Sequence, residues 1–135
     1  IDMDDLVLDP TEILGSGSFG FVLGGFLEGA PVAVKAPFDS QPRFRSLVSV
    51  ANEVRIFRHI RHPNVVLFYG ACIEPEEGGV LLVMERVAGT DLSVYVGAHS
   101  TDADVCRRLR LMLGVACALR YLHGQRPRIV HGDLK

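Results

Sequence analysis

Three glycines in the pattern Gly15-x-Gly17-x-x-Gly20, together with the residues that follow them, constrain the fold more than any other feature. The same pattern occurs in dinucleotide-binding folds, where a helix begins at the glycines. Here the following segment, Phe21 to Phe26, is aromatic, β-branched and twice interrupted by glycine, so it is a poor helix and a fair strand. The sequence therefore predicts a strand, a glycine loop and a second strand, and disfavours the dinucleotide site.

Glycines suit a loop that holds phosphate groups, because without a Cβ the backbone N–H groups can approach phosphate oxygens closely. A plain hairpin turn is the simpler alternative, but it needs only one or two of the three glycines. Phe19 at the tip is either an ordinary exposed apolar residue or a lid over phosphates. The candidate phosphate-binding residues of the loop are Gly15, Gly17, Ser18, Phe19 and Gly20.

Turn signals and hydrophobic periodicity divide the chain into strands, followed by helices. Residues 12 to 36 are expected to form strands with a tight hairpin at Glu28–Pro31, and a helix is expected from about Phe44 to Ile60. Two more strands are expected at Val65 to Ile73 and Val80 to Arg86. The order of elements predicts an α+β fold.

A second long helix is expected from about Asp104 to His123. Thr101 to Asp104 has the form of a capping box at its start. An apolar stripe follows at Val105, Leu109, Met112, Ala116 and Leu119. We expect this stripe to pack on residues beyond Lys135 and to form an exposed patch without them.

Lys35 and Glu53 are a candidate ion pair. Lys35 follows the apolar run Val32–Val34, and Glu53 shares a helix face with Phe57 and Ile60. A carboxylate on a buried helix face is costly unless it is paired. The alternative is a solvated Glu53 at the edge of the face, but the nearby glycine loop and lysine favour the pair.

Composition limits the class of protein. A chain of 135 residues can form one domain with a core, and its 14 basic and 16 acidic residues make nucleic acid or an anionic membrane a poor partner. No apolar run reaches membrane-spanning length. Cys72, Cys106 and Cys117 lie among apolar residues and are expected to be buried thiols in a reducing, cytoplasmic compartment. Since the chain begins with Ile1, an upstream segment with a membrane anchor is compatible with this expectation.

Three segments, in this order, resemble the ATP-binding half of eukaryotic protein kinases. They are the glycine loop, Val32-Ala33-Val34-Lys35, and the closing run Ile129-Val130-His131-Gly132-Asp133-Leu134-Lys135. The run from Val65 to Cys72 and the tight turn at residues 28–32 are similar to the tyrosine-kinase-like group, which includes the Raf and mixed-lineage kinases. The resemblance covers essentially the whole chain.

The resemblance implies a partial kinase domain over residues 1–135. The N-lobe would occupy about residues 8–84, with a five-stranded antiparallel sheet and the αC helix. The hinge would occupy residues 85–90, and the first C-lobe helices would occupy residues 91–135 as far as the catalytic loop.

The resemblance also implies an adenine site. Leu14, Val22 and Ala33 would enclose the adenine ring, with Met84 as the gatekeeper. The Glu85 carbonyl and the Val87 amide would meet the adenine, and Asp91 would bind the ribose hydroxyls.

The remaining implied roles concern the phosphates. Lys35, held by Glu53, would bind the phosphates of ATP, and Lys135 would face the γ-phosphate as in serine/threonine kinases. Asp133 would accept or orient the proton of the substrate hydroxyl. His131 is expected to be a packed structural histidine.

The implied function is transfer of the ATP γ-phosphoryl to Ser or Thr hydroxyls of protein substrates, with Mg²⁺. The family's Mg²⁺ ligands would lie beyond Lys135, so the isolated chain is expected to be inactive and to hold no metal ligands. Gly132 stands where the family most often has an arginine that pairs with an activation-loop phosphate. A pseudokinase or ATP-binding signalling scaffold is the alternative; Gly132 favours it weakly, while Lys35, Glu53 and Asp133 oppose it.

Overall fold

The computed structural model describes residues 1–17, 20–36, 51–73, 79–99, 101, 104–132 and 134. Ser18, Phe19, Asp133 and Lys135 lie outside the described residues, as does the first part of the helix expected from Phe44. The chain divides into two compact units. The first comprises Ile1–Ile60 and Val66–Val87, and the second comprises Arg61–Val65 and Ala88–Lys135.

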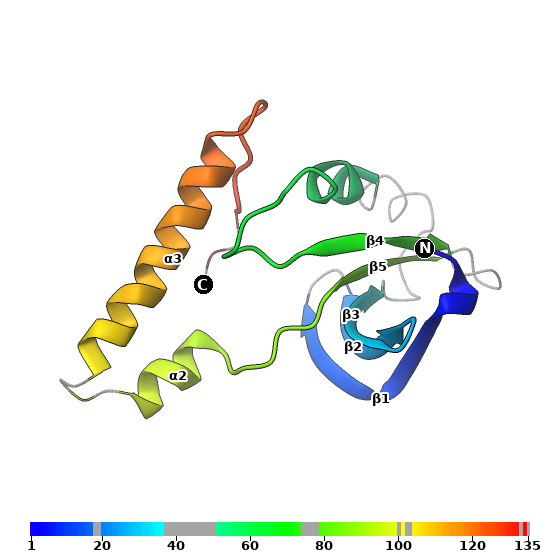
Figure 1. The fold of residues 1–135 in the computed structure, drawn as a ribbon, viewed down its shortest axis with the longest axis horizontal. Coiled ribbons are helices and arrows are strands. Elements are labelled where there is room, and N and C mark those ends of the chain that lie inside the picture. The colour runs from blue at the N-terminus through cyan, green and yellow to red at the C-terminus, as the bar shows by residue number, and fades with distance from the viewer. Residues whose placement is uncertain are drawn as a thin grey trace. The chain divides into compact units, whose positions relative to one another are not determined.

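The first unit contains a five-stranded antiparallel sheet in the order β1-β2-β3-β5-β4 (Figure 1). Its elements are the short 3-10 helix η1 (Met3–Asp5), β1 (Leu6–Gly17), β2 (Gly20–Leu27), β3 (Ala30–Ala36), β4 (Phe68–Ile73) and β5 (Val80–Glu85). The predicted α+β class and five-stranded antiparallel sheet are confirmed.

Two strand boundaries differ from the prediction. β1 begins at Leu6, because Leu6 to Asp9 pair with the second half of β2. β4 begins at Phe68, three residues after the expected start, because the N–H of Val65 donates to the carbonyl of His62 at 3.0 Å in a turn. The expected hairpin is present: Leu27 pairs with Ala30, and the two loop residues have φ values of 48° and 82°.

Alternation along β3 separates the sheet into two faces. Residues directly opposite each other in antiparallel strands point to the same face, and successive residues point to opposite faces. Val32 and Val34 therefore belong to one face, and Ala33 and Lys35 belong to the other. The first face carries the buried core, which contains Leu6, Val32, Val34, Ala36, Cys72, Leu81 and Val83.

Residues 51–57 are helical, and Glu53 in this segment contacts Lys35 on the other face of the sheet. The ring centroid of Phe57 lies 5.9 Å from that of Phe68, and Phe68 is opposite Met84 in the strand register. The described helix ends before the expected Ile60. His59 and Ile60 donate to the carbonyls three residues earlier, so the last turn is tightened into a 3-10 form.

The second unit contains α2 (Leu92–Ala98) and α3 (Val105–His123), drawn in yellow-green and orange in Figure 1. The hydroxyl of Tyr121 accepts the N–H of Arg61 at 3.0 Å, and its ring stacks on His62 with centroids 5.1 Å apart. α3 is therefore tied to the short segment 61–65. The predicted helix at 104–123 is confirmed.

The start of α3 differs from the expectation, whereas its apolar stripe is largely exposed, as expected for this chain. The Thr101 hydroxyl donates to the Asp104 carboxylate at 2.6 Å, which lowers the pKa of Asp104, and Asp104 makes no side-chain bond that caps the helix. The capping box is wrong because Asp104 has α-helical backbone angles (φ −91°, ψ −2°) and closes a turn onto the Thr101 carbonyl. The stripe residues Val105, Leu109 and Met112 are 39%, 58% and 68% exposed, and the buried residues of α3 are Ala118 and Leu122.

The expectation of buried cysteines holds for Cys72 in the core, whereas Cys117 is half-buried and Cys106 is exposed. The expectation is wrong for Cys106 because it lies in the first turn of α3, where its neighbours are exposed as well. Over the part of the chain that the structure describes, no helix is both long enough and apolar enough to span a membrane.

The close approach of β1 and β2 predicts different effects for two glycine substitutions. A Cβ on Gly25 would lie 2.7 Å from the backbone carbonyl oxygen of Val7, so Gly25→Ala should lower the free energy of unfolding by about 1–3 kcal/mol. A Cβ on Gly97 in α2 meets nothing within 4 Å, so Gly97→Ala should be neutral or stabilise by up to about 1 kcal/mol. Thermal unfolding followed by circular dichroism measures both, and equal melting temperatures for the two variants would contradict the assigned strand contact.

Candidate nucleotide-binding site

The glycine loop joins two paired strands. β1 ends at Gly17 and β2 begins at Gly20, and these two residues are opposite each other in the register. The predicted strand–loop–strand arrangement is confirmed, and the helix required by a dinucleotide site is absent from this position because residues 20–27 form β2. A Cβ on Gly15 or Gly17 would meet nothing within 4 Å, so the backbone is open to an approaching group there.

Four of the predicted site residues share the sheet face opposite the core. Val22 is opposite Lys35, and Ala33 is opposite Met84. Since Ala33 and Lys35 are two residues apart on β3, their side chains project from the same face. The register therefore gathers Val22, Ala33, Lys35 and Met84 beside the glycine loop.

The predicted ion pair between Lys35 and Glu53 is present. Lys35 Nζ donates to Glu53 Oε2 at 2.9 Å, and the two side chains are 30% and 27% exposed. Phe57, one helical turn after Glu53, packs on Phe68 and thereby orients the carboxylate toward the sheet. Lys35 and Lys135 are the two lysines among the 14 basic residues, so a lysine at this position is an exception in a chain that otherwise uses arginine.

The segment after β5 is fixed through Glu85. Its N–H donates to the Leu67 carbonyl at 2.8 Å, and its carboxylate accepts the Leu67 N–H at 3.1 Å. Val87, two residues on, is 65% exposed, and Leu14 on β1 is 43% exposed. Both are apolar residues that an adenine ring could cover.

The other predicted residues belong to the second unit or lie outside the described residues. Asp91 belongs to the second unit, where it is exposed at the start of α2. Ser18, Phe19, Asp133 and Lys135 lie outside the described residues.

Two residues of the closing segment are described. The expectation that His131 is packed is wrong: it is exposed, because most of the segment from residue 123 to 132 is exposed with it. Gly132 has a φ of 74°, a backbone conformation in which an arginine would be strained.

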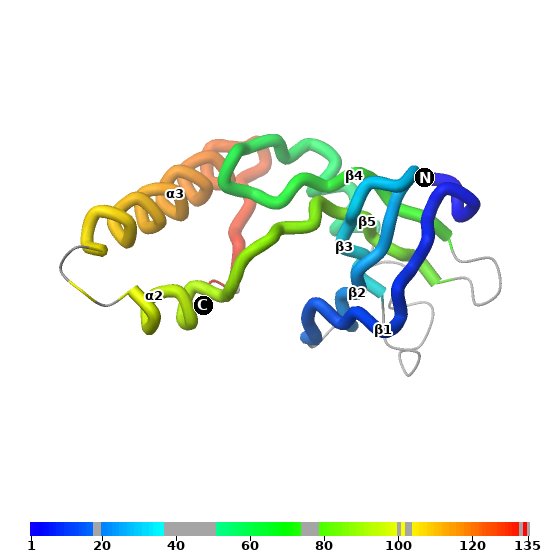
Figure 2. The backbone as a smooth tube through the Cα atoms, turned by 60° about the horizontal axis from the view of Figure 1, so that its bottom comes forward, coloured from blue at the N-terminus to red at the C-terminus, as the bar shows by residue number. Residues whose placement is uncertain are grey.

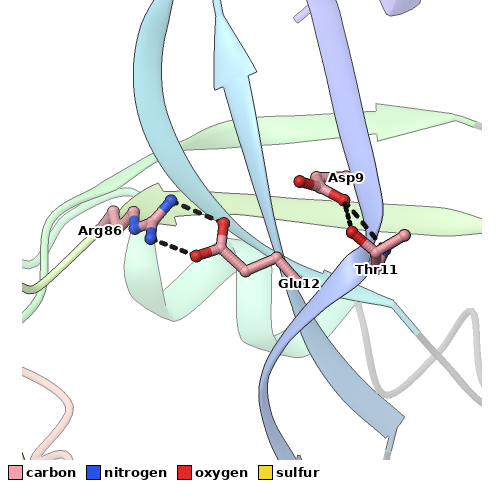
Figure 3. A network of polar contacts seen from close by, with 4 residues as sticks. All are labelled: Asp9, Thr11, Glu12 and Arg86. Atoms are coloured by element: carbon pink, nitrogen blue, oxygen red, sulfur yellow. Dashed lines mark hydrogen bonds and ion pairs between the residues drawn. The ribbon is translucent and has the colours of Figure 1, made fainter.

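One polar contact at the site was not predicted from the sequence. Arg86 donates to both carboxylate oxygens of Glu12, at 2.8 Å from Nη1 and 2.5 Å from Nη2 (Figure 3). The two residues are 74 positions apart, and no local pattern links them. The sequence signal for this contact was the pair of glycines inside β2, because Gly24 leaves the space that the Glu12 carboxylate occupies.

The donor set fits ATP, which protein kinases use with Mg²⁺. An apolar surface of small and medium side chains adjoins one lysine cation and a glycine loop, which suits a planar base followed by a chain of phosphates. Within the described ranges, no three His, Cys, Asp or Glu residues gather into a possible metal site.

The chain belongs to the protein tyrosine and serine/threonine kinase family, whose sequence model matches residues 8–135. It is 38% identical over 130 residues to the dual specificity protein kinase shkD of Dictyostelium discoideum. The aligned region covers 95% of this chain and 17% of shkD. Two Arabidopsis thaliana proteins are also similar. The probable serine/threonine-protein kinase SIS8 is 39% identical over 124 residues (92% of this chain, 12% of SIS8), and the serine/threonine-protein kinase CTR1 is 36% identical over 132 residues (95% of this chain, 16% of CTR1). The chain thus spans less than a fifth of the length of these relatives.

Lys35 and Glu53 are half-buried and form an ion pair, so we expect the two residues to contribute to stability as a unit. Lys35→Met and Glu53→Gln should each lower the free energy of unfolding, and the double variant should lose less than the sum, with a coupling of about 0.5–1 kcal/mol. Urea unfolding of this chain measures the cycle.

The pair Arg107 and Asp104, in which Asp104 is 15% exposed, is the control. Its atoms are 3.4 Å apart and Arg107 is 64% exposed, so the same cycle with Arg107→Gln and Asp104→Asn should give a smaller coupling. Additive losses at Lys35 and Glu53 would mean that the two side chains do not interact in solution.

Proposed function

We propose that this protein is a protein kinase that transfers the γ-phosphoryl group of ATP to Ser or Thr hydroxyls of protein substrates, and that the first unit of this chain binds the nucleotide. One observation carries the proposal. A lysine cation held by Glu53 lies on the same sheet face as Val22, Ala33 and Met84, next to an open glycine loop.

Each part of this surface has a task in phosphoryl transfer. Leu14, Val22 and Ala33 would bury the adenine ring, and the backbone at Glu85 and Val87 would hydrogen-bond its edge. Lys35 would neutralise phosphate charge, and Glu53 would keep its ammonium group in place. Catalysis of this reaction consists mainly of positioning and charge stabilisation, so a fixed cation is the expected contribution of this unit.

The transfer step itself would depend on Asp133 and Lys135. Asp133 would orient the substrate hydroxyl and accept its proton, and Lys135 would face the γ-phosphate. Mg²⁺, when bound, would supply positive charge that neutralises the charge developing during the transfer. Asp91 would bind the ribose hydroxyls.

Specificity for Ser and Thr within the tyrosine-kinase-like group is part of the proposal. Lys135 after Asp133 and Leu134 supports Ser/Thr specificity, and two of the relatives are named as serine/threonine kinases. The name of shkD, a dual specificity kinase, makes tyrosine the residue to test as a second acceptor.

A pseudokinase or ATP-binding scaffold is the second candidate function. Gly132 favours it, because the left-handed backbone there suits glycine and the family's usual arginine is missing. The intact Lys35–Glu53 pair opposes it, since a scaffold need not keep a cation for phosphoryl transfer.

An assay of the full-length protein tests the proposal. With Mg²⁺ and γ-labelled ATP, the wild type should phosphorylate Ser or Thr in a generic protein substrate, and Lys35→Met should reduce the rate by about 100-fold or more. Arg107→Gln, at an exposed site on α3, is the control that should keep full activity. Nucleotide binding without transfer would favour the scaffold, and full activity in Lys35→Met would overturn the assignment. A polypeptide of residues 1–135 alone should show no turnover.

Gly132 predicts weak control by phosphorylation. Without an arginine beside Asp133, a phosphate on the activation loop lacks its usual partner, so phosphatase treatment of the full-length enzyme should change its activity by less than about tenfold, which corresponds to 1.4 kcal/mol of barrier. The measurement compares treated and untreated enzyme at saturating ATP. A larger loss would show that another cation binds the phosphate.

A further inference from the structure

The middle of β1 departs from regular pairing. Asp9 is opposite Gly24, and the next paired residue of β1 is Ile13, opposite Leu23, so three extra residues bulge out of the strand. β1 bends along its length in both views (Figures 1 and 2). Bulges of this kind re-aim a side chain while the flanking strand stays paired.

Local chemistry fixes the bulge. The Asp9 carboxylate accepts the N–H of Thr11 at 2.9 Å and the Thr11 hydroxyl at 2.6 Å (Figure 3). These bonds stabilise the ionised carboxylate and lower the pKa of Asp9. Pro10 has no N–H to contribute to a strand pair. The next side chain, Glu12, is thereby directed away from β1.

Glu12 reaches the segment that follows β5. Both of its oxygens receive a hydrogen bond from the Arg86 guanidinium, at 2.8 Å and 2.5 Å, and the two side chains are 36% and 30% exposed. A planar guanidinium can make two parallel bonds to one carboxylate, which a lysine cannot. The contact therefore fixes the orientation of both side chains.

Gly24 makes room for this pair. A Cβ on Gly24 would lie 2.7 Å from Glu12 Cδ and closer still to Oε2. Because Gly24 is opposite Ala33, the Glu12 carboxylate lies on the sheet face that bears Ala33 and Met84. A glycine inside a strand weakens it, so the space that Gly24 leaves has a structural use.

The pair joins two segments of the proposed nucleotide site. Glu12 comes two residues before Leu14 and three before Gly15, so it fixes the strand that leads into the glycine loop. Arg86 stands between Glu85 and Val87, the two residues proposed to hydrogen-bond the adenine edge. The distance between the glycine-loop strand and this segment is thus set by one bidentate contact.

We infer that Glu12, Arg86 and Gly24 form a clamp that sets the affinity of the site for ATP. Glu12 and Arg86 are positioning residues, since they act through Leu14 and the backbone of Glu85 and Val87. The inference rests on the proposed ATP-binding function. It adds a determinant of nucleotide affinity that lies outside the glycine loop and the lysine–glutamate pair.

The test is ATP affinity in the full-length protein, measured by displacement of a fluorescent ATP analogue, with kcat and the KM values for ATP and for peptide measured alongside. Glu12→Gln and Arg86→Gln should each raise the Kd and the KM for ATP roughly three- to tenfold, and the double variant should be no worse than either single variant. The kcat and the KM for peptide should change by less than about twofold, because the clamp acts on nucleotide binding alone.

Three further variants distinguish loss of the clamp from a general loss of charge or of folding. Glu12→Arg combined with Arg86→Glu should recover most of the affinity, and Gly24→Ala should weaken ATP binding although both charges remain. Arg107→Gln removes a comparable positive charge from α3 and should leave the Kd unchanged. Melting temperatures identify any variant that loses affinity only because it unfolds.

The outcomes distinguish failure of the clamp from failure of the proposed ATP-binding function. Unchanged affinity for ATP in folded Glu12→Gln and Arg86→Gln, in a wild type that binds ATP, would overturn the clamp and leave the proposed function intact. Equal losses of affinity in Arg86→Gln and Arg107→Gln would also overturn it. A wild type that binds no ATP would refute the proposed function and the clamp together.

Discussion

The pairing of β3 with β2 and β5 is the constraint on which the rest of the first unit depends. A strand exposes alternate residues on opposite faces, so one register assigns Val32 and Val34 to the core and Ala33 and Lys35 to the site. A shift by one residue would bury the lysine among valines and turn the core outward. The buried apolar side chains therefore define the position of the cation, because they leave a single register in which no charge enters the core.

The sequence predicts those parts of the fold and site that depend on local patterns. The two-residue turn at Glu28 and Gly29, the strand–loop–strand around the glycines, and the helix from about Asp104 are each encoded within a few neighbouring residues. The Lys35–Glu53 pair was also predictable, although it joins two elements, because a carboxylate on an apolar helix face requires a cation. The cost of burying an unpaired carboxylate thus predicts that Glu53 has a cationic partner.

Other features depend on packing that the sequence does not encode locally. The bond between Glu12 and Arg86 connects residues 74 positions apart. Both side chains are partly exposed, so neither would be costly without a partner, and burial therefore does not predict the pair. Thr101 and Asp104 fit the pattern of a capping box, but the hydroxyl and carboxylate bond to each other, a competing arrangement with the same spacing. Cys106 was expected to be buried because its sequence neighbours are apolar, and His131 because the resemblance implies a structural role, but both lie where the adjoining segment is exposed.

The space above Gly24 has an evolutionary consequence. A glycine there is required only while a carboxylate occupies the space, and that carboxylate is held only while an arginine faces it. The three positions should therefore drift together: a lineage that loses the arginine releases the glutamate, and selection against a larger residue on β2 then relaxes. Among homologous chains we expect glycine at this strand position to accompany the acidic–basic couple, and alanine or serine to appear where the couple has been lost.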